Sequence, residues 1–410
     1  MTICLNFRDE TFKIRVNDNN KFVFIMKKIL IIATTSYAGM GPYVVNIVNN
    51  FLQSDPVFFF FQDDTNDYFR KNIKTELQSK CVFCRRSNSN LHKLHDLLTT
   101  KYTFEDVILE ICKKEDISLV HSINGPVRKS LLQRFDQMNI KVLGTVHDLH
   151  PHEAKKAVCK MLRQKILYER INKDTAINPF LVTNSKNQEE ELHSQYPYKC
   201  IFFHDFPSLV TKTISTGKEI PKELRCINKP YILFFGRIEK YKGVELLYKA
   251  FLENKNLSDN FFLVIAGKGD LTFNRIEEEK NVIFIHRYID DSEIRSLYKN
   301  ASCVVYPYIS ATQSGVLSLA YYFETPVLTS DVPFFRSILS SSGAGVLFQN
   351  GNIKDLQKQL SYILHLNPQS IKEKESDYYQ KYFQGRTIRE QILNIYISIL
   401  RIDEKQMCPK

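Results

Sequence analysis

The sequence predicts an α/β protein with two Rossmann-like domains, each built on a doubly wound parallel sheet, and three observations support this fold class. The chain has 410 residues, more than one hydrophobic core usually serves, so two domains are expected. Apolar strand-like runs alternate with helix-like segments at short intervals, as in doubly wound sheets. The runs 231–235 and 261–266 each end in a glycine-containing turn, where such sheets bind ligands.

The second half of the chain gives the clearest succession of elements. A helix is expected over 291–300 with Ser292 as its N-cap, another over 316–323, and a largely helical stretch over 378–400. The strands predicted around these helices lie at 231–235, 261–266, 281–288, 303–307 and 325–328.

The first half has a sheet of its own. Its first strand is expected at 29–34, and Pro42 suits the first position of the helix that follows. Further strands are expected at 117–120 and 141–146. No run reaches the roughly 18 apolar residues of a membrane span, and the polar start lacks the pattern of a secretory signal.

The net charge of +11 leaves three classes of partner open: nucleic acid, an anionic membrane surface, and anionic substrates. The cations form no single long tract and no nucleic-acid-binding motif is visible, which argues against the first class. Nine scattered cysteines fit reduced thiols in the cytoplasm. The isolated pair Cys81 and Cys84 is interpreted as structural rather than as a zinc or redox motif.

The segment 155–173 mixes lysine and arginine with apolar residues and predicts a basic amphipathic helix. Two interpretations stay open. In the first, the charged face of the helix is solvated and its apolar stripe packs on the core. In the second, the helix docks on the anionic cytoplasmic leaflet of a membrane.

The turn 236–243 is the most informative stretch of the chain. It opens with Gly236 directly after a buried strand and carries Arg237 and Lys242 ahead of a helix-like run. Two fixed cations at the carboxyl end of a parallel strand are what a diphosphate requires. The alternative is a surface turn with two solvated cations. The turn therefore predicts a diphosphate site.

Two loops of the first half are further candidates. Gly39 and Gly41 let the backbone approach a ligand at the start of a helix, whose N-terminus is a ready anion site. After the strand 141–146 come three histidines and two acids within 147–153. Their spacing does not place them on one helical face, and Pro151 breaks any helix, so a metal site is disfavoured there.

Several motifs in a fixed order then carry a resemblance to a known family: FFGRIEKYKGVELLYKAF, FLVIAGKGD, VIFIHRYIDDSEIRSLYKNASCVVYPY and ATQSGVLSLAYYFETPVLTSDV. The chain resembles retaining glycosyltransferases of the GT-B fold, family 4 (glycosyl transferases group 1), well over roughly residues 228–350 and more loosely before them. The resemblance implies two Rossmann-like domains that face a cleft.

The resemblance also implies a domain organisation. We expect an N-terminal extension at 1–25, an acceptor-side domain at 26–207 and a linker at 208–228. A nucleotide-sugar-binding domain is expected at 229–385, and a C-terminal helix at 386–410 that crosses back to the first domain.

The implied activity is transfer of a sugar from a nucleotide-diphosphate sugar to a glycan or lipid-linked acceptor, in cell-surface polysaccharide synthesis. Such an enzyme is expected in the cytoplasm or on the inner face of its membrane, without a metal or other cofactor. Arg237 and Lys242 would stabilise the leaving diphosphate, and His147 would face the transferred sugar. The implied donor-binding residues are Gly39, Gly41, Gly236, Gly267, Gly269, Arg287, Tyr288, Gln313, Ser314 and Gly315.

One departure from the family pattern bears on activity. Family members often carry two glutamates in and after the loop that here reads Ser310 to Gly315, whereas no acid occurs in this chain from there until Glu324. Gln313 or Ser310 would then contact the sugar. The departure also keeps an alternative open, a catalytically degenerate GT-B module that only binds. A basic nucleic-acid-binding protein is the remaining alternative.

Overall fold

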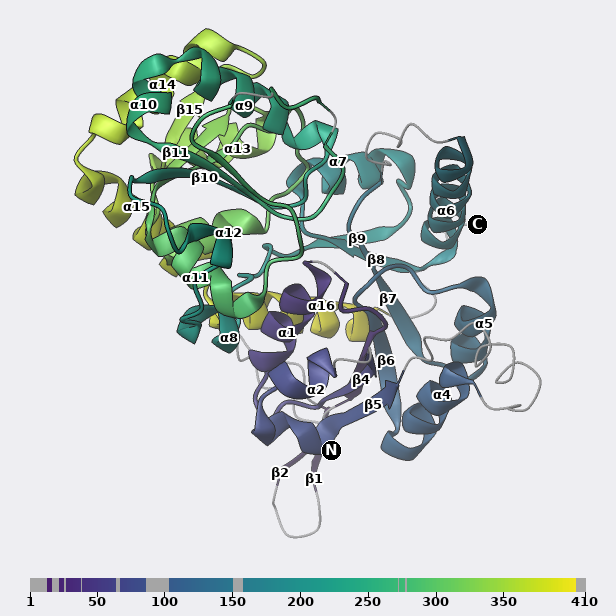
Figure 1. Ribbon diagram of the computed structural model, residues 1–410. Helices are drawn as coiled ribbons and strands as arrows, with labels where there is room; N and C mark the ends of the chain where they lie inside the picture. Colours follow the sequence, from purple (N-terminus) through teal and green to yellow (C-terminus); the bar gives the residue numbers. More distant parts are fainter. Residues whose placement is uncertain are drawn as a thin grey trace. The chain divides into compact units, whose positions relative to one another are not determined.

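The computed structural model describes residues 13–16, 22–25, 27–37, 39–63, 67–85, 103–149, 158–271, 273–276 and 279–402. The chain divides into two α/β units (Figure 1). The first unit comprises residues 1–149, 166–204 and 388–410, and the second comprises 150–165 and 205–387. Each unit is built on one parallel sheet with helices on both faces, so the predicted fold class is confirmed.

The strands of the second unit are β10 (Tyr231–Phe235), β11 (Phe262–Ala266), β12 (Val282–Ile285), β13 (Ala301–Tyr306), β14 (Val327–Ser330) and β15 (Val346–Phe348). They form a sheet in the order β12-β11-β10-β13-β14-β15, with all pairings parallel. The chain therefore builds outward in one direction from β10 and, after β12, in the other direction from β13. This reversal is the topological switch point of a doubly wound sheet.

The first unit repeats this plan with seven strands: β3 (Lys28–Ala33), β4 (Val57–Asp63), β5 (Cys81–Arg85), β6 (Ile117–Ser122), β7 (Lys141–Val146), β8 (Phe180–Thr183) and β9 (Cys200–Phe203). The order is β5-β4-β3-β6-β7-β8-β9, again all parallel, with the switch point between β3 and β6. A separate antiparallel pair, β1 (Lys13–Val16) and β2 (Phe22–Ile25), lies within the expected N-terminal extension.

The helices around the first sheet are α1 (Met40–Asn49), α2 (Tyr68–Asn72), α4 (Phe104–Glu115), α5 (Lys129–Gln137), α6 (Val158–Ile177), α7 (Lys186–Gln195) and α16 (Gly385–Arg401), with the 3₁₀ turn η1 (Thr75–Lys80). The division between the units falls inside α6 and near the start of α16.

The helices of the second unit are α8 (Lys212–Thr216), α9 (Val244–Glu253), α10 (Lys255–Asn260), α11 (Asp291–Lys299), α12 (Val316–Tyr322), α13 (Pro333–Ser342), α14 (Ile353–His365) and α15 (Pro368–Tyr382), with the 3₁₀ turns η2 (Lys222–Leu224) and η3 (Lys240–Lys242).

The central strands are buried on both faces, which explains their continuous apolar sequences. Five of the six residues of β3 are buried, and so are the first four of β10. Parallel strands covered by helices on both sides lose the alternation of apolar and polar residues that marks a half-exposed sheet. Burial of these strands holds their carboxyl ends, and hence the loops that follow, on a rigid base.

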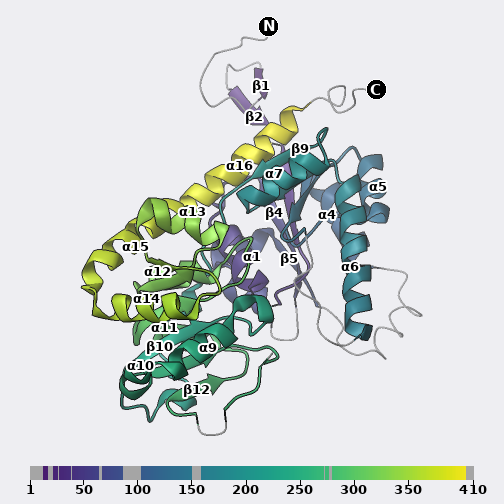
Figure 2. The same ribbon diagram turned by 90° about the horizontal axis from the view of Figure 1, so that it is seen from above.

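The C-terminal helix α16 packs against the first unit. The guanidinium of Arg389 pairs with the carboxylate of Asp55, with 2.8 Å between Nε and Oδ2. The Nζ of Lys141 donates to the carbonyl oxygen of Ile399 at 2.9 Å. Buried aliphatic residues Ile388, Ile392, Ile395 and Ile399 line the same helix. Figure 2 shows α16 running along this unit.

Two local expectations were wrong. The N-cap of α11 is Asp290, not Ser292; its carboxylate and the N3 residue Glu293 form a capping box, which a serine two residues later cannot do. Helix α1 begins at Met40, so Pro42 is its third residue. The stretch 378–400 is largely helical, as expected, with a break between Tyr382 and Gly385 that separates α15 from α16.

Cys81 and Cys84 are both free thiols on β5. Burial raises the pKa of Cys81 to about 12, so its thiolate is strongly disfavoured. Within the part of the chain that the structure describes, no helix is long and apolar enough to cross a membrane.

Candidate functional site

The loops at the two switch points carry most of the candidate residues. In an open parallel sheet, ligands bind beyond the carboxyl ends of the strands where the strand order reverses. In the second unit these are the loops after β10 and β13, and in the first unit the loops after β3 and β6.

Glycines bring the loops after β10 and β11 into direct backbone contact. Gly236 has φ 146° and Gly267 has φ 151°, a left-handed region that side chains rarely adopt. A Cβ on Gly267 would overlap the carbonyl oxygen of Gly236, and one on Gly269 would overlap that of Ile238. The N–H of Ile238 donates to the carbonyl of Lys268 at 3.0 Å, so the two turns continue the pairing of their strands.

The two predicted cations differ in their surroundings. The side chain of Arg237 is 47% exposed, and its guanidinium donates to the Glu239 carboxylate at 3.1 Å. Lys242 is only 9% exposed and lies in the turn η3. Its Nζ is 3.7 Å from the ring centroid of Tyr308, in the loop after β13. The structure thus offers one solvent-facing cation and one largely buried cation on the same turn.

The turn after β10 is fixed to the loop after β13. Gly243 adopts φ 67°, and any Cβ there would overlap the carbonyl oxygen of Pro307. The N–H of Ile309 donates to the carbonyl of Tyr241 at 2.7 Å. These two contacts cross the switch point and hold the η3 turn against the β13 loop.

The β13 loop then leads to Gln313, Ser314 and Gly315. The hydroxyl of Ser314 donates to the hydroxyl of Tyr308 at 3.3 Å, and Gly315 is the N-cap of α12. The Oε1 atom of Gln313 is buried and has no hydrogen-bond partner within the described residues. An unsatisfied buried acceptor is costly, so it marks a position where a donor group is wanted.

Arg287 is fully engaged by protein groups. Its guanidinium donates to both oxygens of Glu223 and both oxygens of Glu293, at 2.7–3.2 Å, and to the carbonyl of Tyr288 at 3.3 Å. These bonds use all five of its N–H donors. The pair with Arg287 lowers the pKa of Glu223. Arg287 therefore ties η2 to α11, while the neighbouring residue Tyr288 is 56% exposed. A donor-binding role for Arg287 stays a prediction that requires some of these bonds to exchange.

In the first unit, the loop after β3 is held by a residue from the loop after β6. The Oδ1 atom of Asn124 accepts from the N–H of Thr34 at 2.6 Å and of Thr35 at 3.2 Å. Gly39 is the N-cap of α1 and has open space around it. Gly41 is packed more tightly, since a Cβ there would lie 2.6 Å from the ring of Tyr68.

His147 follows β7 and is half-buried. Its Nε2 lies 2.8 Å from the carbonyl oxygen of Ile123. A carbonyl only accepts, so Nε2 carries the proton and Nδ1 is left as an acceptor. Burial lowers the pKa of His147, against the opposing effects of the Ile123 carbonyl and Asp148, so the neutral form is favoured. The ring of Tyr43 meets the imidazole edge-on at 5.1 Å between centroids.

A buried polar network lies behind these loops. The hydroxyl of Tyr43 donates to the side chain of Asn184 at 2.9 Å, and Asn184 donates to the carbonyl of His204 at 3.0 Å. The imidazole of His121 lies between the hydroxyls of Tyr396 and Thr145, at 2.7 and 2.9 Å. Burial lowers the pKa of His121 to about 3, so this histidine is neutral.

Sequence reasoning missed Tyr308, Asn124 and Tyr43. Each makes contacts with residues far away in the sequence. Tyr308 ends one of the motifs that carry the family resemblance, but nothing in that motif indicates its contact with Lys242. Position is the signal that could have found Asn124 and Tyr308, because each lies two residues after a strand that borders a switch point.

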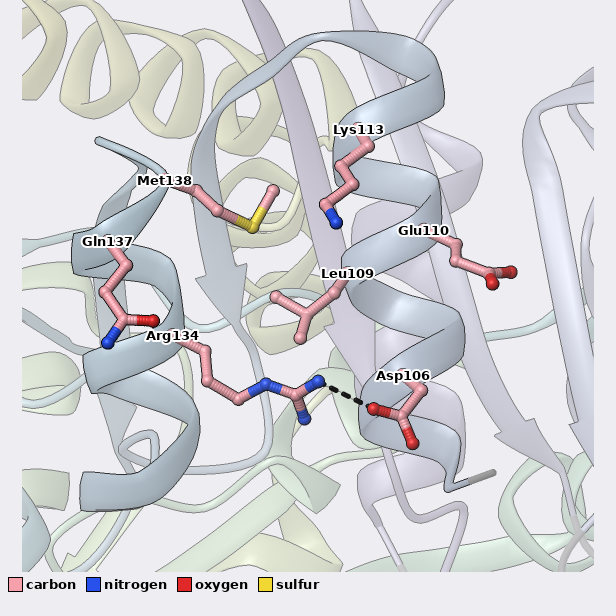
Figure 3. Close-up of a pocket in the computed structure, with 7 residues that line it drawn as sticks. All are labelled: Asp106, Leu109, Glu110, Lys113, Arg134, Gln137 and Met138. Atoms are coloured by element: carbon pink, nitrogen blue, oxygen red, sulfur yellow. Dashed lines mark hydrogen bonds and ion pairs between the residues drawn. The ribbon is translucent and has the colours of Figure 1, made fainter. Parts of the chain in front are cut away.

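Figure 3 shows a pocket of about 410 Å³ elsewhere in the first unit. Its side chains come from α4, α5 and Met138 at the end of α5, and it contains an ion pair between Arg134 and Asp106 at 2.6 Å. None of the predicted site residues lines it. Among the described residues, no group of three or more histidine, cysteine, aspartate or glutamate side chains is arranged to hold a metal ion.

Comparison with known families finds one match in the second unit. Residues 216–382 match the family described as glycosyl transferases group 1. The glycogen synthase of Thermus caldophilus is 30% identical over 139 residues, 32% of this chain and 31% of that protein. The O-antigen chain mannosyltransferase RfbU of Salmonella typhimurium is 29% identical over 128 residues, 29% of this chain and 34% of that protein. The matched segments span about a third of these curated relatives.

Solved structures resemble the whole chain. Sucrose-phosphate synthase from Thermosynechococcus elongatus has a TM-score of 0.62 at 18% identity, covering 91% of this chain and 99% of that one. HepE from Anabaena, solved with UDP and glucose, has a TM-score of 0.61 at 15% identity, covering 91% and 100%. These likenesses show the GT-B fold. The similarity to glycosyl transferases group 1 is confined to residues 216–382.

Proposed function

We propose that this protein is a retaining glycosyltransferase that moves a sugar from a nucleotide-diphosphate sugar to a glycan or lipid-linked acceptor. One observation carries the proposal. Arg237 and Lys242 lie on one turn at the switch point of the unit that matches the glycosyl transferases group 1 family. Fixed cations there stabilise the negative charge that grows on a departing diphosphate.

The reaction breaks the bond between the anomeric carbon and the diphosphate oxygen and forms a bond between that carbon and the acceptor oxygen. The loop from Ser310 to Gly315 contains no carboxylate that could act as a nucleophile. We therefore favour a front-face reaction, in which the acceptor attacks from the side the diphosphate leaves. The acceptor proton then passes to an oxygen of the departing diphosphate, and the anomeric configuration is retained.

His147 would orient a hydroxyl of the sugar or the acceptor. Its Nε2–H is already given to the carbonyl of Ile123, so its Nδ1 is the atom that accepts. Gln313 would contact the sugar from the second unit, because its buried Oε1 needs a hydroxyl or amide donor. No metal is required in this scheme, since side-chain cations can neutralise the diphosphate.

The acceptor side includes a surface suited to an anionic membrane. On α6 the side chains of Leu162, Ile166 and Leu167 are 59%, 57% and 53% exposed. Lys165, Arg170 and Lys173 on the same helix are exposed as well. Exposed apolar side chains can enter the headgroup boundary of a bilayer, and the cations beside them attract anionic lipids. A lipid-linked acceptor and a role in cell-surface polysaccharide synthesis at the cytoplasmic face would follow from such docking.

The proposal is tested by incubating the protein with a panel of nucleotide-sugars and measuring release of the nucleoside diphosphate. A thermal-shift screen over UDP, GDP and ADP comes first, because a bound nucleotide raises the apparent stability. UDP is the first probe, since HepE was solved with it. NMR of the product's anomeric proton tests retention. The second candidate function is a GT-B module that only binds, and the lack of acidic residues in the segment 310–323 is the observation that suggests it. Nucleotide binding without any turnover or donor hydrolysis would favour this candidate.

A further inference from the structure

The ammonium of Lys242 lies against an aromatic wall. Its Nζ is 3.7 Å from the ring centroid of Tyr308 and 4.8 Å from that of Tyr241. Both rings are buried, and Lys242 itself is 9% exposed. A cation–π contact strengthens as the cation loses water, so the contact with Tyr308 helps to hold the ammonium in place.

Tyr308 is itself held on several sides. Its hydroxyl accepts from Ser314 at 3.3 Å, and its backbone carbonyl accepts from the hydroxyl of Ser330. The ring packs against those of Phe335 and Tyr306, at 5.2 and 5.7 Å between centroids. Burial raises the pKa of Tyr308, so the ring is a neutral phenol and its contact with the ammonium is not an ion pair. The ring is therefore a rigid support on the far side of the switch point from Lys242.

An aromatic ring and a carboxylate can each hold a cation in place, but they differ in how many of the cation's N–H donors they occupy. The two carboxylates around Arg287 take up four of its five N–H donors and offset its charge. A ring face attracts an ammonium through its quadrupole, carries no net charge, and occupies none of the ammonium N–H groups by conventional hydrogen bonds.

We propose that Tyr308 is a positioning residue for diphosphate binding, and that it acts through Lys242. Its ring presents the Lys242 ammonium to the diphosphate of the donor and keeps it there as the leaving group departs. This inference rests on the proposed function, because it takes the diphosphate site at the β10 turn as given. Two contacts between the loops fix the spacing between the lysine and the ring. They are the hydrogen bond from Ile309 to Tyr241 and the close packing of Gly243 on Pro307.

A double-mutant cycle tests the inference. Binding of inorganic pyrophosphate, which contains no base or sugar, is measured by calorimetry for the wild type, Tyr308→Leu, Lys242→Ala and the double variant. Tyr308→Leu should weaken binding at least about fivefold when Lys242 is present, and by less than about twofold when Lys242 is already alanine, since residues that act together are not additive. Tyr308→Phe keeps the ring and should stay within about twofold of the wild type.

The controls separate positioning from loss of structure. Tyr321 on α12 has an equally buried ring, and its hydroxyl donates to the carbonyl of Ala344 at 2.8 Å. The control variant Tyr321→Leu should leave pyrophosphate binding unchanged. If Tyr308→Leu does not fold, Tyr308→Met, of similar volume but without a ring, takes its place under the same criteria. Equal losses from Tyr308→Leu with and without Lys242, or a matching loss in Tyr321→Leu, would overturn the inference. No loss in Lys242→Ala would instead overturn the proposed diphosphate site.

Discussion

The side-chain oxygen of Asn124 accepts the backbone N–H of Thr34 at 2.6 Å, joining the loops that follow β6 and β3 across the switch point of the first sheet. The second sheet has a counterpart, in which the N–H of Ile309 donates to the carbonyl of Tyr241 at 2.7 Å, between the loops after β13 and β10. Both units therefore bind their two switch-point loops to each other. A ligand at either place meets loops whose relative position is already set, which lowers the entropic cost of binding.

Asn124→Ala removes this link in the first unit, and we expect turnover to fall about tenfold or more with a modest loss of stability. Two backbone donors lose their acceptor, so the loop with Gly39 and Gly41 should loosen. Asn124→Asp keeps an acceptor oxygen and serves as the matched control, with most activity retained. Steady-state kinetics with the donor identified by the nucleotide screen provide the measurement. Normal turnover in Asn124→Ala would show that the link does not matter to the reaction.

Arg237→Ala and Lys242→Ala should each lower turnover by roughly 10²-fold, the usual effect of removing one preorganised donor to a developing anion. Lys249→Ala on the neighbouring helix α9 is the control, because its exposed ammonium is paired with Glu245 at 2.7 Å on the helix surface. Circular dichroism confirms that each variant is folded. If both site variants turn over at a near-normal rate, the diphosphate is bound somewhere else.

Transfer should survive a chelator. The proposed site stabilises the diphosphate with the side chains of Arg237 and Lys242, so a divalent cation has no required part in the reaction. Turnover is measured in excess EDTA, and again after adding magnesium or manganese. Complete loss of activity in EDTA that either metal restores would contradict the metal-independent scheme.

Replacing Lys165 and Lys173 with glutamate should abolish sedimentation with anionic vesicles and leave nucleotide binding unchanged. Each cation near an anionic surface contributes about 1 kcal/mol, and the double replacement reverses two of them. Lys113→Glu with Lys114→Glu on α4 makes the same change in net charge on another exposed helix and should leave sedimentation intact. If the wild type does not sediment at low salt, α6 does not dock on membranes by charge.

The alternation of strands and helices was enough to predict two parallel sheets, because apolar runs such as β3 and β10 are buried on both faces and carry a strong signal. The loops that follow β10 and β11 could also be located, since glycines mark them in the sequence. What the loops touch could not be predicted. Arg287 looks in the sequence like a cation at a strand end, yet it pairs with Glu223, 64 residues away. No periodicity encodes such a contact, and the same holds for Tyr308 and Lys242.

The last prediction concerns Glu375, a buried carboxyl on α15. Its Oε1 accepts from the N–H of Val327 at 3.0 Å, while its Oε2 has no hydrogen-bond partner within the described residues. Burial raises the pKa of Glu375 well above its usual range. Below the pKa of the unfolded chain, about 4.3, both states are protonated and ionisation costs nothing. As the pH rises through that value towards the folded pKa, the unfolded state ionises first, so the free energy of unfolding falls.

Glu375→Gln keeps the acceptor for Val327 and removes the ionisation, so its stabilising effect should be small near pH 4.5 and grow towards pH 8. Each unit by which the folded pKa exceeds the unfolded one is worth about 1.4 kcal/mol at the upper end of this range. Melting temperatures of both proteins across the range give the measurement. Glu373→Gln, on the exposed side of the same helix, should show no such growth with pH. A glutamine variant that melts below the wild type at pH 8 would mean that the folded protein stabilises the Glu375 carboxylate after all.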